Sequence, residues 1–168
     1  ISRYAVLYGD ADLPAGTQKP QPTWAGAKHF SQVILLGTPN EGSVNSLNAL
    51  VNGYSLGTVR LDLPFVQDSS KFLVFTIPAA YQLLPAPGTL RAFDEKLDPV
   101  FVDHFDPKTW SKYGWNVIND KKFADRFNAA ERKLAPVYFQ AVLDRAKRFH
   151  EALAASDGKT GGVGFYIL

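Results

Sequence analysis

The stretch VILLGTPNEGS, residues 33–43, decides the fold class. An apolar run ends at Gly37, a short turn leads through Gly42, and Ser43 follows as a residue that can cap a helix. A strand, a glycine-containing turn and a helix in this order form a unit of α/β proteins, and such turns often carry ligand sites. We therefore expect a strand at residues 32–37, of the kind that is buried on both faces of a parallel sheet.

The glycines of this turn raise the question of a nucleotide site, because Gly37 and Gly42 have the spacing of a phosphate-binding loop. That motif requires a lysine after the second glycine, and here Ser43 follows Gly42. Pro39 removes one backbone N–H from the phosphate cradle, and Glu41 would place a negative charge beside the phosphates. We therefore interpret Gly37, Pro39 and Gly42 as a structural turn.

The composition is that of a globular domain with a substantial core. The chain has 168 residues, of which 46% are hydrophobic and 13% aromatic. A net charge of +2 does not indicate a nucleic-acid partner, and the absence of cysteine excludes thiol nucleophiles and Cys-ligated metals. No apolar run approaches the roughly 18 residues of a membrane span. No metal or cofactor is indicated, and nothing in the sequence fixes a compartment or an oligomeric state.

Several segments carry helix start and stop signals. The opening ISRYAVLYG has the apolar spacing of a helix that stops at Gly9. Ser43 can cap a second helix that stops at Gly53. In FDPKTWSKYGW, Asp106 is the expected cap, a proline takes the first helical position and Gly114 ends the helix. A further helix is expected from Pro78 through AAYQLLP.

The last third of the chain predicts helices and then a strand. From about Asp120 apolar residues recur every three or four positions, and Pro136 should break or kink the segment into two helices. The closing TGGVGFYIL predicts a glycine-rich turn followed by a buried strand. The apolar stripe of the helical segment consists of Leu134, Tyr138, Val142, Ala146, Phe149 and Leu153.

Three segments, in their order and approximate spacing, resemble the lecithin:cholesterol acyltransferase-like family of α/β-hydrolases, especially its bacterial lipase/acyltransferase branch. They are LGTPNEGS at 36–43, IPAAYQLLPAPG at 77–88 and DPKTWSKYGW at 106–115. In that family the strand after the nucleophile helix ends in a G-x-P-x-x-G turn, and an aromatic-rich Y-x-L-L-P element comes later. The matching residues are Gly37, Pro39 and Gly42 for the turn, and Tyr81, Leu83, Leu84 and Pro85 for the second element.

The resemblance implies an α/β fold class, a fragment of an α/β-hydrolase with few strands and a mainly helical cap insertion. Residues 1–42 would be a core piece, with the helix that follows the nucleophile elbow and the strand at 32–37. Residues 43–157 would form the cap or lid, because a connection between neighbouring core elements is typically only about 2–6 residues long. Residues 158–168 would be the core strand that leads toward the catalytic acid.

The resemblance also implies a serine nucleophile in G-x-S-x-G, followed along the chain by an acid and a histidine. The sequence contains no G-x-S-x-G. We therefore expect the nucleophile upstream of Ile1 and the acid and histidine beyond Leu168, so that the sequence is a fragment cut at both ends. The parent would be a serine esterase, lipase or lipid O-acyltransferase that forms an acyl-enzyme from a lipid or ester substrate. The 168-residue chain alone is expected to be inactive and to contain no catalytic residue.

The local candidates for chemistry have simpler explanations. Ser43 is expected to cap a helix, not to act as a nucleophile. Asp103, His104 and Asp106 could pass for a metal cluster, but they are too close together on one short segment to make a convincing ligand set. His150 is flanked by charged residues and is expected to be a solvated helix residue.

Three aromatic residues are candidates for substrate binding. Tyr81, Trp110 and Trp115 lie in segments punctuated by proline or glycine, and they could line an acyl channel. Clusters of this kind are more often part of a core. A competing hypothesis from another class is a noncatalytic α/β or helical module that binds a partner or a lipid surface through these aromatics.

Overall fold

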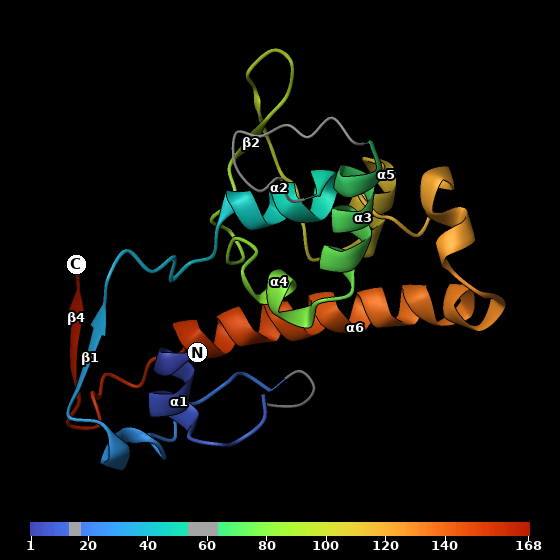
Figure 1. Ribbon diagram of the computed structural model, residues 1–168. Coiled ribbons are helices and arrows are strands. Elements are labelled where there is room, and N and C mark those ends of the chain that lie inside the picture. The colour runs from blue at the N-terminus through green and yellow to red at the C-terminus, as the bar shows by residue number, and fades with distance from the viewer. Residues whose placement is uncertain (14–17, 54–63) are drawn as a thin grey trace. The chain divides into compact units, whose positions relative to one another are not determined.

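The computed structural model describes residues 1–13, 18–53 and 64–168. The chain divides into two compact units, each described by itself below. Unit 1 comprises Ile1–Asn40 and Arg148–Leu168, and unit 2 comprises Glu41–Lys147. Helices dominate and strands are few (Figure 1), so the coarse prediction of a mixed α/β chain with few strands is confirmed. The assignment of 1–42, 43–157 and 158–168 to hydrolase core, cap and core stays a prediction, and 54–63 of it lie outside the described residues.

Unit 1 begins with α1, Ser2–Tyr8, which ends at Gly9 with a φ of 66° as the sequence predicts. The short 3₁₀ helix η1, Ala27–His29, lies close to α1. A Cβ on Gly26 would overlap the carbonyl of Ala5, so only glycine permits this approach of the two helices.

The sheet of unit 1 pairs two strands that are distant in the sequence. Strand β1, Gln32–Leu35, runs parallel to β4, Gly164–Ile167 (Figure 1). Val33 and Leu35 point to the covered face, where they form a cluster with Val6 of α1. The order of β1, a glycine-containing turn and a helix that follows Ser43 agrees with the opening motif, but the helix that covers the described strands is α1, which precedes them.

The other face of this sheet is exposed, contrary to the prediction that the strand is buried on both faces. β1 alternates between exposed and buried residues, and Ile34 is 56% exposed, so the strand is not buried on both faces as predicted. It also ends at Leu35, two residues earlier than expected. β4 is likewise mostly exposed, with Val163 just before it buried. The physical reason is that the described sheet of unit 1 has two strands, with α1 and η1 packed on one side only.

The described residues of unit 2 form a helical assembly with one small hairpin. In Figure 1, α2 to α5 gather along α6, which contributes its residues up to Lys147 to this unit. Its helices are α2 Val44–Asn52, α3 Pro64–Phe75, α4 Pro78–Gln82, α5 Pro107–Lys112, the 3₁₀ helix η2 Lys121–Arg126 and α6 Ala129–Ala154, and its hairpin pairs β2 Ala92–Phe93 with β3 Pro99–Val100.

The predicted helix boundaries of α2 and α5 are confirmed by their caps. The Ser43 side chain accepts a hydrogen bond of 3.1 Å from the backbone N–H of Asn45, and Gly53 ends α2 with a φ of 83°. Asp106 accepts one of 2.9 Å from the N–H of Lys108, which starts α5. α4 has its proline at the first turn as expected, but it ends at Gln82 and does not continue to Pro85.

The core of unit 2 forms around one face of α6. Phe139 and Leu143 are nearly fully buried there and pack with residues of α2, α4 and α5. The fully or largely buried members of this cluster are Leu47, Leu50, Phe75, Tyr81, Leu84, Phe105, Trp110, Val117, Phe123, Phe139, Val142, Leu143 and Ala146.

α6 overturns the prediction of two helices. It continues through Pro136, which removes the hydrogen bond that the carbonyl of Arg132 would otherwise accept. Both residues are on the exposed side of the helix, where water can satisfy that carbonyl, so the helix does not break. The predicted stripe also began on the wrong residue, because Leu134 is 63% exposed and the neighbouring Ala135 is buried.

Candidate functional site

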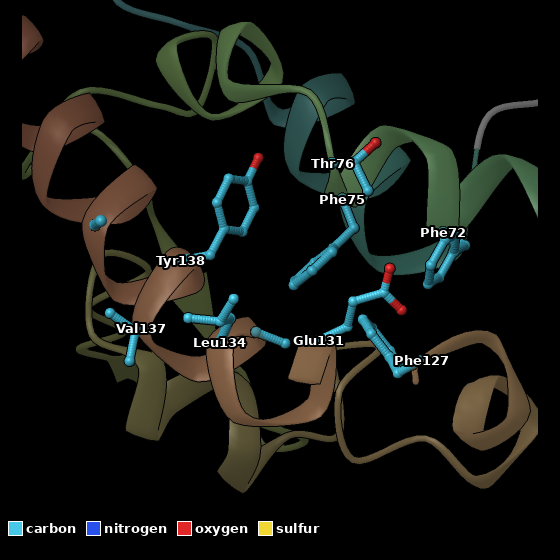
Figure 2. Close-up of a pocket in the computed structure, with 10 residues that line it drawn as sticks. Phe72, Phe75, Thr76, Phe127, Glu131, Leu134, Val137 and Tyr138 are labelled. Carbon is cyan, nitrogen blue, oxygen red and sulfur yellow. The ribbon is translucent and has the colours of Figure 1, made fainter. Parts of the chain in front are cut away.

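A cavity of about 590 Å³ lies in unit 2 between α3 and the N-terminal half of α6 (Figure 2). Ligand sites for small molecules typically have volumes of about 300–1,000 Å³ and mostly apolar linings with a few polar groups. The residues that line this α3–α6 cavity are Phe72, Phe75, Thr76, Phe127, Glu131, Leu134, Ala135, Val137, Tyr138 and Ala141.

Helix periodicity brings these side chains together. Phe72 and Phe75 are three residues apart and project from the same side of α3, with Thr76 directly after the helix. On α6, Leu134 and Tyr138 are four residues apart and present a second lining face. Because Leu134 remains largely exposed, the cavity opens to solvent beside it.

The start of α6 fixes the position of Glu131, the single charged residue among the lining residues that the structure describes. The side chain of Asn128 accepts hydrogen bonds from the N–H groups of Ala130 and Glu131, at 2.9 and 3.0 Å. Glu131 in turn accepts a bond of 2.8 Å from the N–H of Asn128. This reciprocal pair is a capping box, which anchors the Glu131 backbone and one of its carboxylate oxygens at the cavity.

Four aromatic rings form much of the cavity wall. Phe127 makes edge contacts with Phe72 and with Phe75, with centroid distances of 5.1 and 6.5 Å. Phe75 and Tyr138 are 5.9 Å apart with their planes at 60°. Rings packed edge to face hold one another in place, so the wall is preorganised.

The cavity has few polar groups, and the only charge among its described lining residues is negative. The Thr76 hydroxyl already donates to the carbonyl of Leu73 at 2.7 Å. Burial raises the pKa of Tyr138, so its phenol is neutral at neutral pH. Glu131 carries a carboxylate that points toward Phe72 and Phe127 in Figure 2. No lysine, arginine or histidine is among the lining residues that the structure describes.

The three predicted substrate-binding residues lie in the core of unit 2 and are not among the residues that line this cavity. Tyr81 is fully buried and donates a hydrogen bond of 2.8 Å to the carbonyl of Phe75. Trp110 is also buried, and its ring is 5.8 Å from that of Trp115, which is partly buried. Tyr81 and Trp110 both pack against Phe139, so the structure does bring these side chains to one cluster. Their role in acyl binding stays a prediction.

The turn containing Gly42 is held against the Y-x-L-L-P element. Gly42 has a φ of 79°, and a Cβ there would overlap the carbonyl of Leu84. The N–H of Ser43 donates to the carbonyl of Leu83, and the N–H of Ala86 donates to the carbonyl of Glu41, both at 2.8 Å. Two of the three segments that carry the family resemblance therefore contact each other directly. Gly37, which also has a positive φ of 54°, has open space around it, and Pro39 is exposed.

The acidic cluster around His104 serves the local backbone. Asp103 accepts a bond from the N–H of Phe105, and Asp106 caps α5. His104 is buried, and its Nε2 donates to the carbonyl of Pro85 at 2.6 Å in the tautomer that this contact requires. Burial lowers the pKa of His104, although the Pro85 bond and the Asp103 charge oppose that shift.

His150 corrects a further expectation. It was predicted to be a solvated helix residue, but it is only 4% exposed. Leu153 and Phe149, which the stripe assigned to the apolar side, are partly buried nearby on α6. The buried face of α6 is therefore wider than the predicted stripe, so a histidine bordering that stripe falls inside it.

Two patterns in the sequence mark elements that line the α3–α6 cavity. The tetrapeptide Asn128–Glu131 has the capping-box pattern and marks where α6 begins. Phe72 and Phe75 are three residues apart, which is helical spacing. No pattern in the sequence reveals that these two helices pack beside each other, because that depends on tertiary contacts.

The structure indicates neither a metal site nor a membrane span among the residues it describes. In residues 1–13, 18–53 and 64–168 no group of three metal-ligating side chains is arranged to hold an ion. Within the same ranges no helix combines the length and the apolar character needed to cross a bilayer. Comparison with protein-family models, curated proteins and solved structures finds no match to the chain.

Proposed function

We propose that this chain is the part of a serine esterase, lipase or lipid O-acyltransferase that runs from the helix after the nucleophile elbow to the core strand leading toward the catalytic acid. The observation that carries the proposal is the parallel pairing of β1 with β4, two strands separated in the sequence by the whole of unit 2. A parallel sheet with a large helical insertion between neighbouring strands is what the lecithin:cholesterol acyltransferase-like resemblance implies.

The geometry of unit 1 supports a larger sheet. Parallel sheets are almost always covered on both faces. Here α1 covers Val33 and Leu35, while Ile34 and Leu36 on the other side are 56% and 69% exposed. Under the proposal, further strands and helices of the parent hydrolase would pair with and cover this sheet.

Unit 2 supports the role of a cap. An inserted segment of this size is usually functional, and this one holds an apolar cavity of about 590 Å³. A cap with its own apolar surface can guide the hydrocarbon part of an ester toward a reaction centre and exclude water from it. The exposed Leu134 and Val137 at the cavity provide such a surface.

The proposed chemistry proceeds through an acyl-enzyme. A serine outside this chain would attack the ester carbonyl, the alcohol would leave with a proton, and water or a second alcohol would then take the acyl group. This chain would bind and orient the apolar part of the substrate. Ser43 would take no part, because its hydroxyl caps α2.

The experiment uses the natural polypeptide, with whatever sequence flanks Ile1 and Leu168. A fluorophosphonate probe should label one serine, and peptide mapping should place it in a G-x-S-x-G segment shortly before Ile1. Hydrolysis of p-nitrophenyl esters of increasing chain length should be lost when that serine is replaced by alanine. Absence of both the label and the hydrolysis would refute the proposal and favour the noncatalytic binding module.

The binding module remains the second candidate because of one observation. All the lining residues that the structure describes for the α3–α6 cavity belong to unit 2. A ligand could therefore bind there whether or not a catalytic centre exists elsewhere.

A further inference from the structure

We propose that the α3–α6 cavity is a binding site for an organic cation, a molecule that carries an ammonium group on an apolar body. The proposal goes beyond the esterase or acyltransferase function and does not depend on it. It rests on the chemistry of the cavity wall, which combines aromatic rings with one carboxylate.

The aromatic wall is the first argument. Phe72, Phe75, Phe127 and Tyr138 supply four rings around one space. The faces of aromatic rings carry negative electrostatic potential and attract ammonium groups within about 6 Å, and aromatic cages bind quaternary ammonium ligands in this way. The rings are fixed by edge-to-face contacts with centroid distances between 5.1 and 6.5 Å, so little order has to be gained on binding.

The charge of the wall is the second argument. Glu131 is the single charged residue among the described lining residues, and it is acidic. One of its oxygens accepts the capping bond from Asn128, which leaves the other oxygen to face a ligand. A free fatty acid would bring its carboxylate toward Glu131 without a compensating cation in the wall. A cation gains from both the rings and the carboxylate.

The apolar part of the wall determines which uncharged body the ligand can carry beside its ammonium group. Leu134, Ala135, Val137 and Ala141 offer only hydrocarbon, and the cavity opens beside the exposed Leu134. We therefore place the ammonium group between Glu131 and the aromatic rings, and an aliphatic or aromatic body along α6.

The first experiment compares three probes with the same eight-carbon tail, namely octyltrimethylammonium, 1-octanol and octanoate. Each is titrated into the isotopically labelled full chain, and binding is followed by amide chemical shifts. We expect octyltrimethylammonium to bind roughly tenfold more tightly than octanol, and octanoate to bind least, because cation–π contacts with several rings and the attraction to the carboxylate are together worth a factor of this order. Equal or tighter binding of octanol, or no binding of the cation, would overturn the proposal.

Variants separate the cation site from general apolar binding. Glu131→Gln removes the charge and keeps an oxygen that can accept the capping bond from Asn128, so helix α6 should remain intact. We expect this variant to lose roughly threefold in affinity for the cation and nothing for octanol. Glu151→Gln, at an exposed position farther along α6, is the matched control and should bind like the parent chain. An unchanged cation preference in Glu131→Gln would refute the role of the carboxylate.

A ring variant tests the aromatic contribution. Phe127→Leu keeps an apolar side chain and removes one aromatic face, so it should weaken cation binding several-fold and leave octanol binding nearly unchanged. Equal losses for both probes would show that the wall acts only through its apolar area, and would refute the cation–π argument.

The same ammonium chemistry occurs in free molecules and in lipid headgroups, and vesicles distinguish the two sources. The chain is mixed with vesicles of a zwitterionic trimethylammonium phospholipid and sedimented. Sedimentation that is weaker for Glu131→Gln than for the parent chain and for Glu151→Gln identifies a headgroup as the ligand. Binding of octyltrimethylammonium without sedimentation identifies a free organic cation. If the vesicles sediment parent and variant alike and the soluble cation does not bind, the cavity is not a cation site.

Discussion

Substituting alanine for Gly42 should destabilise unit 2 by more than a change of backbone conformation alone can explain. Gly42 has a φ of 79°, which is unfavourable for any residue with a Cβ. In addition, the new methyl group would overlap the carbonyl of Leu84. Gly88 is the matched control, because its φ of 82° is nearly the same and nothing lies within 4 Å of a Cβ built there.

The two costs can be estimated separately. A left-handed conformation costs a non-glycine residue roughly 1–2 kcal/mol, and both variants carry this cost. Forcing an extra methyl into a packed contact costs about a further 1–3 kcal/mol, and only Gly42→Ala carries that one. We therefore expect Gly88→Ala to lose about 1–2 kcal/mol and Gly42→Ala about 2–5 kcal/mol of unfolding free energy.

The assay is urea unfolding followed by tryptophan fluorescence. Trp110 and Trp115 report on unit 2, and a Trp24→Phe background removes the third tryptophan, which belongs to unit 1. The midpoint of Gly42→Ala should be clearly below that of Gly88→Ala at a similar slope. Equal losses in the two variants would refute the close approach of the turn to the Y-x-L-L-P element.

Four further predictions concern the buried groups and the excluded activities. Burial lowers the pKa of His104 in the folded chain. Below about pH 6.5 the unfolded chain therefore binds a proton that the folded chain does not bind. The free energy of unfolding should be fully present above that pH and should decline below it, by at most about 1.4 kcal/mol per pH unit. Urea midpoints at about pH 7.5 and about pH 5.5 should show this loss; the loss should persist in His29→Gln and shrink in His104→Gln, and an undiminished loss in the second variant would contradict the assignment. Tyr81→Phe leaves a buried carbonyl without its donor and should cost about 1–3 kcal/mol in the same assay, whereas Tyr113→Phe at an exposed site should cost almost nothing; equal effects would count against the bond. Titration with ATP or GTP should give no saturable binding at millimolar ligand, and micromolar affinity would restore the phosphate-loop interpretation. The chain alone should not hydrolyse p-nitrophenyl esters above background, and turnover that disappears in Ser43→Ala would make that serine a nucleophile.

The local parts of the fold were predictable from the sequence because they depend on short-range chemistry. Ser43 and Asp106 cap their helices as expected, since a side chain that satisfies a free N–H acts over two or three residues. Gly9 and Gly53 end theirs because only glycine readily takes the positive φ found there. Glu95 and Asp98 lie in the turn of the small hairpin, where Asp94 accepts bonds from the N–H groups of Lys96 and Asp98.

What depends on tertiary packing was predicted less well. Pro136 was expected to break α6, but its position on the solvent side lets the helix continue. Ile34 was expected to be buried, and whether a strand is covered depends on elements that its own sequence does not encode. The α3–α6 cavity was not foreseen, because it arises where two helices far apart in the sequence meet.

The pairing of β1 with β4 has a consequence for the order in which the protein folds. β1 is synthesised before unit 2, and its partner strand is synthesised after it. Because domains generally fold as units during synthesis, unit 2 can fold before β4, the partner of β1, has been synthesised. A folded unit 2 replaces a long chain with a compact one, which reduces the loop entropy that must be lost when the two strands meet. Destabilising unit 2, for example at Gly42, should therefore slow the formation of a sheet to which the altered residue does not belong.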